Sequence, residues 1–171
     1  MGCKFFEDWK QDLWSKRFVR DHVRYNNEIM CAASRIIQAS NDRAIQQNPN
    51  MQQQQQQGDG GRYFDSMHIR RCDFQSKETK ISGKEMYSIS SEHLTPNKIV
   101  YIITDGKNQN FFQKFDENYD IIYLDDFKHL ISDNNVNYDG MVEQISCAHS
   151  GVFYGTWFST FSGYIIEYEG I

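Results

Sequence analysis

After residue 62 the chain alternates between short apolar runs and stretches with helical periodicity. The run Lys98–Thr104 (KIVYIIT) is the clearest strand, because an uninterrupted apolar segment is typical of a parallel sheet covered on both faces. The alternation predicts an α/β fold, a Rossmann-like parallel sheet with helices on both faces. The predicted strands are 63–69, 98–104, 119–124 and 151–155, and the predicted helices are 82–92, 108–115, 138–148 and 159 to about 168.

The first 45 residues are expected to form a helical lead-in segment. Trp9, Leu13 and Trp14 recur at helical spacing, which predicts a short amphipathic helix with its apolar stripe docked and its basic face in solvent. Asn26 is the expected N-cap of a second helix, with Glu28 in the first turn. The expected buried face of that helix consists of Ile29, Ala32, Ala33, Ile36 and Ile37.

Residues 46–61 differ sharply from their surroundings in composition. They contain six consecutive glutamines at 52–57, followed by Gly58-Asp-Gly-Gly61. Such a segment has too little apolar surface to offset the entropy lost on ordering. We expect a disordered, Gln-rich insertion in front of an α/β domain at 62–171. A polyglutamine interaction role is the alternative.

Composition and charge exclude several classes of protein. A length of 171 residues suits one α/β domain, and a net charge of −5 argues against a nucleic-acid partner. The four cysteines and five histidines show no metal-ligand spacing, so neither a metal site nor a disulfide is predicted. No run approaches the roughly 18 apolar residues of a membrane span, and no signal-peptide pattern is present at the N-terminus.

Basic and hydroxyl side chains directly follow two of the predicted strands. His68, Arg70 and Arg71 close the first strand and bring two guanidinium groups to its end. Thr156 follows the last strand, and Ser159 and Thr160 open the helix after it. The carboxyl ends of parallel strands share one edge, where α/β proteins bind ligands. Guanidinium groups match phosphate oxygens, and a helix N-terminus offers free N–H groups. The pattern therefore predicts a diphosphate site; surface salt bridges and ordinary helix caps are the alternative.

Carboxylates follow the middle strands. Asp105 ends the second strand, and Asp125 and Asp126 follow the third, as in a receiver-like magnesium site. That alternative requires a lysine at a later strand end, which Lys128 does not supply, and arginines beside the pocket argue against an acidic site. Glu143, on a predicted helix, faces solvent by default but could read a base or a ribose from the pocket side.

Five motifs occur in the order found in the GDP-fucose protein O-fucosyltransferase family. They are His68–Phe74 (HIRRCDF), Tyr101–Asp105 (YIITD), Tyr123–Phe127 (YLDDF), Gly140–Gln144 (GMVEQ) and Gly155–Phe161 (GTWFSTF). The run 17–25 (RFVRDHVRY) also resembles the helix before the first motif. The chain thus resembles the C-terminal, donor-binding part of the plant and algal type, over its whole length except the glutamine insertion.

The resemblance implies a metal-independent, inverting glycosyltransferase of the GT-B arrangement, with GDP-fucose as donor and no cofactor. In the full-length context it would transfer fucose to Ser or Thr hydroxyls of a protein or glycan acceptor, in the Golgi or ER lumen. Residues 1–60 show no counterpart of the family's N-terminal Rossmann-like domain. A truncated, non-catalytic GDP-sugar-binding module is therefore the alternative.

The resemblance also assigns roles to individual residues. Arg70 matches the catalytic arginine that holds the diphosphate and helps the fucosyl bond to break. His68, two residues before it, matches the histidine that lies against the nucleotide. The loop on the phosphates and base corresponds to Ser159, Thr160 and Phe161, and Asp105 and Glu143 match acidic positions near the nucleotide. Cys72 stands where the first motif usually has glycine.

Overall fold

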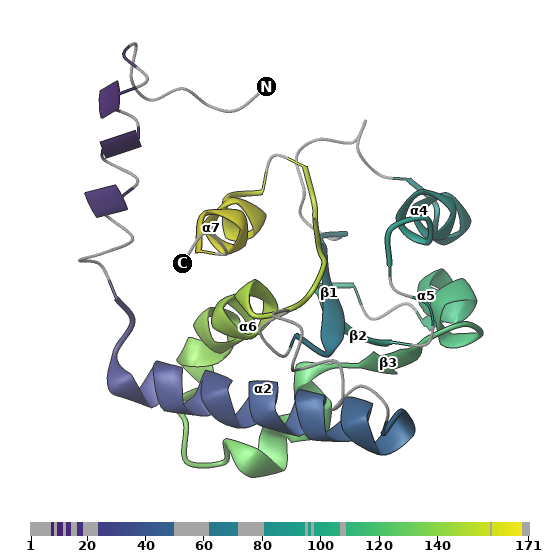
Figure 1. Ribbon diagram of the computed structural model, residues 1–171, viewed down its shortest axis with the longest axis horizontal. Coiled ribbons are helices and arrows are strands. Elements are labelled where there is room, and N and C mark those ends of the chain that lie inside the picture. The colour runs from purple at the N-terminus through teal and green to yellow at the C-terminus, as the bar shows by residue number, and fades with distance from the viewer. Residues whose placement is uncertain are drawn as a thin grey trace.

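Four parallel strands form a sheet in the order β3-β2-β1-β4 (Figure 1). The computed structural model describes residues 8, 10–11, 13–14, 17–18, 24–49, 62–71, 81–94, 96, 98–106, 109–157 and 159–168. Within them the strands are β1 (Phe64–Ile69), β2 (Ile99–Thr104), β3 (Asp120–Ile122) and β4 (Phe153–Gly155). The predicted fold class, an α/β protein with a Rossmann-like parallel sheet, is confirmed.

The strand order places a topological switch point between β1 and the edge strand β4. The chain proceeds outward from β1 through β2 to β3 and then crosses back, so that β4 pairs with the free side of β1. In the register, Ile69 pairs with Thr104 and His68 pairs with Gly155, so the neighbouring strands end at the same edge. Ligands of open α/β sheets bind outside the carboxyl ends of the strands where the order reverses, which here is between β1 and β4.

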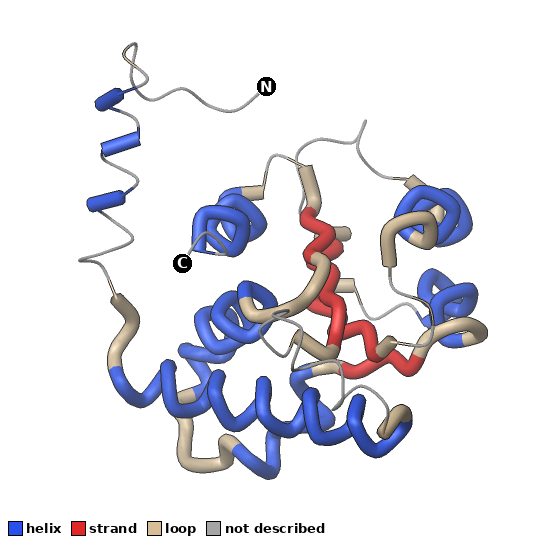
Figure 2. The backbone as a smooth tube through the Cα atoms, in the orientation of Figure 1, coloured by secondary structure: helices blue, strands red, loops and turns tan. Residues whose placement is uncertain are grey.

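Helices cover both faces of this sheet (Figure 2). On one face lie α2 (Asn27–Gln47), α6 (Asp139–Ala148) and α7 (Thr160–Tyr168), with the 3-10 helices η3 (Leu124–Leu130) and η4 (Val136–Tyr138). On the other face lie α4 (Gly83–Ser90) and α5 (Gln109–Asp116). Side chains of β2 alternate between the two cores: Tyr101 packs with the α2 side and Ile102 with the α5 side.

Helix α2 shares its core with the sheet, although the sequence assigned it to a lead-in segment. Its buried residues are Ile29, Ala32, Ala33, Ile36, Ser40 and Ala44, and Ile37 packs against the same core while remaining partly buried. The helix continues to Gln47, so the first two residues of the segment predicted to be disordered are helical, which corrects that boundary. Both Arg43 and Gln47 bond to the Asp120 carboxylate on β3, and these tertiary contacts extend the helix. The rest of the Gln-rich insertion, from residue 50 to 61, lies outside the described residues.

Asn26 caps α2 as the sequence predicts. Its side-chain oxygen accepts a hydrogen bond of 2.9 Å from the backbone N–H of Ile29. Replacing Asn26 with alanine leaves that N–H without its cap, so we expect the free energy of unfolding to fall by about 1 kcal/mol. Urea denaturation checks this, with Asn26→Ser as the control that retains a capping oxygen. Equal losses in the two variants would contradict the capping role.

Strand β3 is shorter than predicted. The apolar run suggested 119–124, but the strand ends at Ile122, and a 3-10 helix begins at Leu124. The Asp126 carboxylate accepts the backbone N–H of Tyr123 at 2.8 Å, and the N–H of Asp126 donates to the Tyr123 carbonyl at 3.1 Å. This reciprocal cap turns the chain, so Leu124 is buried beneath η3 rather than in the sheet.

A buried carboxylate at the opposite edge holds β4 beside β1. Asp65 is fully buried; it accepts the N–H of Val152 at 3.1 Å and lies 3.5 Å from the ammonium of Lys98. The backbone adds a bond from Gly151 N to Phe64 O at 2.8 Å. The pair of strands that forms the switch point is thus anchored at its amino end by a charge pair as well as by the ladder.

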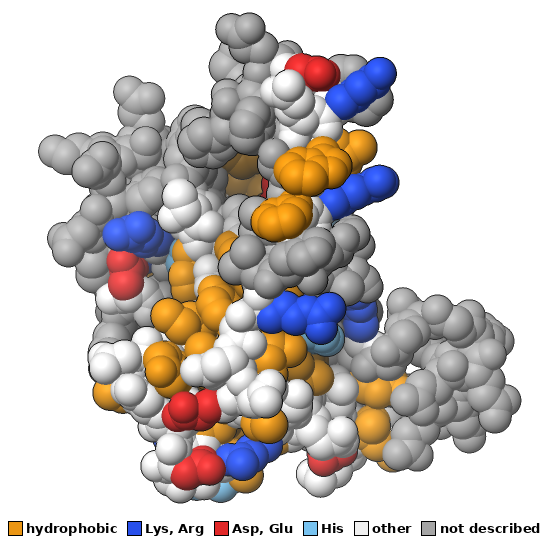
Figure 3. Space-filling model, turned by 90° about the vertical axis from the view of Figure 1, so that its left-hand side faces the viewer, with side chains coloured by type: hydrophobic (Ala, Val, Ile, Leu, Met, Phe, Trp, Pro, Cys, Tyr) orange, Lys and Arg blue, Asp and Glu red, His pale blue; other side chains and the backbone are white. Residues whose placement is uncertain are grey.

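Residues 10–11, 13–14 and 17–18 near the N-terminus are helical, and their apolar side chains are exposed. The rings of Trp14 and Phe18 stack with centroids 5.4 Å apart, and Leu13, Trp14 and Phe18 are exposed by 42%, 67% and 45%. Figure 3 shows apolar and basic side chains side by side on this stretch. The predicted docking of the apolar stripe is therefore wrong for these residues, while Trp9 lies outside the described part. No helix among the described residues is long and apolar enough to span a membrane.

Candidate functional site

Thr156 ties the end of β4 to the end of β1. Its backbone N–H donates to the carbonyl of His68 at 3.0 Å, and its hydroxyl donates to the same carbonyl at 2.8 Å. The same hydroxyl accepts the backbone N–H of Arg70 at 2.9 Å. The predicted phosphate ligand Thr156 thus uses its hydroxyl to fix the backbone from which the Arg70 side chain extends.

His68 is buried behind this junction. It is 7% exposed, its Nδ1 lies 2.8 Å from Ser162 Oγ, and its ring centroid lies 4.5 Å from that of Phe161. Burial lowers the pKa of His68 to about 4; Asp105 opposes this shift and Arg70 adds to it. At neutral pH the imidazole is therefore uncharged. It can pack against a nucleotide or share one hydrogen bond, but it adds no positive charge for phosphate.

The side chains of Arg70 and Arg71 lie in different surroundings. The side chain of Arg70 is 44% exposed, and its Nε lies 3.9 Å from Oδ2 of Asp105. Asp105 Oδ1 also accepts the backbone N–H of Arg71 at 2.5 Å. The Arg71 guanidinium instead lies 3.9 Å over the ring of Phe111 and donates to the carbonyl of Ile81 at 3.2 Å. The expectation that both arginines serve the edge is wrong for Arg71, because cation–π packing on α5 holds its side chain.

The first turn of α7 stands against the end of β4. Ser159 is buried, and its Oγ accepts the N–H of Ser162 at 3.5 Å, whereas Thr160 is exposed. A Cβ at Gly155 would lie 2.6 Å from Cβ of Ser162, so only glycine permits this approach of helix to strand. Thr156 links the helix start to Arg70, because its carbonyl accepts the N–H of Ser159 at 3.3 Å and its hydroxyl accepts that of Arg70. Ser159 caps the helix, and Thr160 is exposed.

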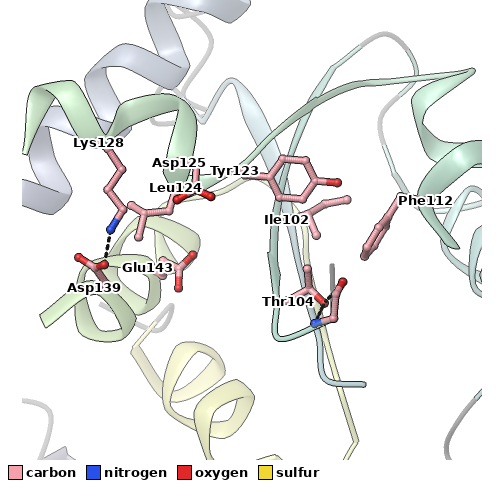
Figure 4. A pocket seen from close by; sticks show the side chains of 10 residues that line it. Ile102, Thr104, Phe112, Tyr123, Leu124, Asp125, Lys128, Asp139 and Glu143 are labelled. Atoms are coloured by element: carbon pink, nitrogen blue, oxygen red, sulfur yellow. Dashed lines mark hydrogen bonds and ion pairs between the residues drawn. The ribbon is translucent and has the colours of Figure 1, made fainter. Parts of the chain in front are cut away.

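A pocket of about 460 Å³ opens at the ends of β2 and β3 (Figure 4). Figure 4 shows Tyr123, Ile102 and Phe112 on one side of the pocket and the charged side chains, with Leu124 among them, on the other. The lining residues are Ile102, Thr104, Gly106, Phe112, Tyr123, Leu124, Asp125, Lys128, Asp139 and Glu143. Thr104 and Gly106 flank Asp105, so the pocket adjoins the Arg70 region.

Glu143 on α6 contributes a partly buried carboxyl to this pocket. Asp139 is paired with Lys128, whereas Glu143 has no hydrogen-bond partner in the described part of the chain. Burial, reinforced by Asp139 and Asp125 and opposed by Lys128, raises the pKa of Glu143 to about 7. A ligand that donates hydrogen bonds to the Glu143 carboxyl would stabilise its ionised form.

Phe161 lies between α6, which lines the pocket, and His68 near the end of β1. Its ring packs on His68, and its Cε2 lies 3.6 Å from where a Cβ on Gly140 of α6 would be. The structure thus gathers most of the predicted residues along one edge and places Glu143 in the adjoining pocket. Those gathered at the edge are His68, Arg70, Asp105, Thr156, Ser159, Thr160 and Phe161. Cys72 lies outside the described residues.

Sequence reasoning missed two side chains of this region. Ser162, the partner of His68, has no spacing that sets it apart from other helix serines. Lys128 was set aside because it is not at a strand end, yet η3 carries it to the pocket wall beside Asp139.

In the part of the chain that the structure describes, no three His, Cys, Asp or Glu side chains are placed to hold a metal ion.

A four-stranded parallel sheet with helices on both faces defines a Rossmann-like α/β protein, and Arg70 and Thr156 mark a candidate ligand site at the edge where the strand order reverses. The chain belongs to the GDP-fucose protein O-fucosyltransferase family, whose model matches residues 2–171. The resemblance carried by the five motifs is thereby confirmed, and the family supports a fucosyltransferase-like function in broad terms. A search of curated proteins finds no match.

Proposed function

We propose that the chain binds GDP-fucose at the carboxyl edge of the sheet and transfers fucose to a Ser or Thr hydroxyl of a protein or glycan acceptor. One observation carries the proposal. At the switch point of a sheet in a member of this family, the backbone N–H of Arg70 bonds to Thr156, whose carbonyl accepts the N–H of Ser159 directly before α7. The GT-B arrangement and residence in the Golgi or ER lumen, implied by the motifs, remain predictions.

The two halves of GDP match the two halves of the edge. Arg70 and the free N–H groups of the first turn of α7 suit the diphosphate. The adjoining pocket, of about 460 Å³, suits the nucleoside. Ribose hydroxyls and the guanine N1–H and N2–H groups are hydrogen-bond donors, and the Glu143 carboxyl, which makes no hydrogen bond to the other described residues, is the proposed acceptor.

Fucose transfer requires stabilisation of the negative charge that develops on GDP, the leaving group. As the bond between fucose C1 and the β-phosphate oxygen breaks, negative charge grows on GDP, and the acceptor oxygen bonds to C1 from the opposite face. Arg70 and the helix N–H groups would stabilise that charge without a metal ion. The hydroxyl proton must pass to a base as the new bond forms.

A second candidate, a GDP-sugar-binding module without transfer, is favoured by the engagement of Asp105. This carboxylate accepts the Arg71 N–H and pairs with Arg70. It therefore positions the arginine and does not serve as the general base for the acceptor hydroxyl. Binding would then proceed with Arg70 and the pocket, whereas turnover would fail.

Calorimetry with GDP tests the binding step. We expect GDP to bind without added divalent metal and with the same affinity in EDTA, because the positive charges come from Arg70 and the helix terminus. Incubation with GDP-fucose and a folded acceptor, with GDP release measured, then separates the two candidates. Strict dependence on magnesium would contradict the proposal, and metal-free binding without transfer would select the second candidate.

A further inference from the structure

Gln144 on α6 joins two segments that are remote in sequence. It is a buried amide, 8% exposed; its Oε1 accepts from the Tyr25 hydroxyl at 2.6 Å, and its Nε2 donates to the Phe161 carbonyl at 3.4 Å. A carbonyl can only accept, so the amide must turn its NH₂ group toward Phe161. The amide oxygen then faces position 25, where a side chain that donates is required.

The ring of Tyr25 reinforces the same connection. It packs against Tyr164 of α7 with centroids 5.4 Å apart, and Tyr164 in turn stacks on Tyr168 at 6.0 Å. Tyr164 lies one turn after Phe161 on the same helix. Tyr25 therefore contacts α7 through its ring and, by way of Gln144, through its hydroxyl.

The turn of α7 held in this way is the one that contacts His68. Phe161 packs its ring on the imidazole at 4.5 Å, and Ser162 bonds to Nδ1 at 2.8 Å. A shift of this turn would move both partners of His68 and the helix N-terminus that the proposed function assigns to phosphate. Tyr25 contacts neither group itself.

We propose that Tyr25 is a positioning residue, which acts through Gln144 and Phe161 to set the first turn of α7 against His68 and thereby the diphosphate half of the donor site. The proposal rests on the proposed function for its effect on GDP. Its effect on His68 is independent of the ligand. The hydroxyl performs the positioning, while the ring supplies packing that phenylalanine would also supply.

The test is Tyr25→Phe, which removes one oxygen and retains the ring. We expect GDP affinity measured by calorimetry to fall by about fivefold, the scale of one lost hydrogen bond. We expect the NMR titration of His68 to move upward from its depressed midpoint, because a loosened turn admits water to the imidazole. The control is Tyr87→Phe on α4, whose ring packs against Phe115 on the opposite face of the sheet and should alter neither readout.

A double-mutant cycle with Gln144→Leu completes the test. If the hydroxyl acts only through the amide, the double variant binds GDP no more weakly than the weaker-binding of the two single variants. Independent effects of the two substitutions would add instead. Additive losses overturn the proposal, as does a Tyr25→Phe variant that is less stable but keeps GDP affinity and the His68 titration. If the wild-type chain binds no GDP, the proposed function fails, and the His68 titration alone still decides the role of Tyr25.

Discussion

Replacement of Arg70 by alanine is expected to weaken GDP binding by about 2–4 kcal/mol, which makes it the largest effect of any single substitution at the edge. Its backbone N–H is fixed by Thr156 and its side chain is paired loosely with Asp105, so the guanidinium is positioned before a phosphate arrives. Alanine removes both hydrogen bonds of a bidentate contact and leaves the phosphate charge without its counter-charge. Calorimetry with GDP measures the loss.

Arg71 and Arg43 provide matched controls for this substitution. Arg71→Ala loses the contact with Phe111 and should reduce stability, with GDP affinity close to that of the wild type. Arg43 pairs with Asp120 at the amino end of β3, so Arg43→Ala should leave affinity unchanged. Arg70→Lys retains the charge without the fork and should lie between the wild type and alanine. A larger loss of affinity in Arg71→Ala than in Arg70→Ala would contradict the assignment.

GDP affinity is expected to rise with pH and to level off above about pH 7. Burial among acidic neighbours holds the pKa of Glu143 near 7, and hydrogen-bond donors of the nucleoside require the ionised carboxylate. Below that pKa a proton must be released before the ligand can bind, so affinity falls by about tenfold for each pH unit. Calorimetry at pH 6 and pH 8 should therefore differ by about tenfold. His68, with a pKa of about 4, stays neutral throughout this range.

The unliganded protein should show the opposite trend in stability. Glu143 has an ordinary pKa of 4.5, which applies to the unfolded chain, and a pKa of about 7 when folded, so the folded state binds more protons between those values. Its contribution to stability is therefore present below pH 4.5 and is lost as pH rises toward 7. Glu143→Gln should flatten both profiles, and Asp125→Asn should move the affinity midpoint to lower pH by removing one facing carboxylate. An unchanged affinity profile in Glu143→Gln would assign the dependence to another group.

Much of the fold is predictable from apolar periodicity. The uninterrupted run of β2 and the strand ends at Ile69 and Thr104 lie where the sequence puts them, because a strand buried on both faces has few polar alternatives. The same periodicity predicts the position of the candidate site, because parallel strands that are followed by Arg70 and Thr156 end at the same edge of the sheet.

The remaining features depend on contacts that periodicity does not encode. Asp126 converts an apolar run into a 3-10 turn through one hydrogen bond to the backbone of Tyr123. Arg71 prefers a ring on α5 to the ligand edge, although it is adjacent to Arg70 in the same motif. Lys128 reaches the pocket only because η3 turns it there. In each case a particular hydrogen bond, ring contact or turn, and not the spacing of apolar residues, sets the position of the side chain.

A crystal structure of the chain with GDP tests the central claim most directly. We predict the β-phosphate on the Arg70 guanidinium and the first turn of α7, and the nucleoside in the pocket with a donor group directed at Glu143. Phosphates held instead through a metal ion at Asp105, Asp125 and Asp126, or GDP bound at the amino edge of the sheet near Asp65, would contradict the account.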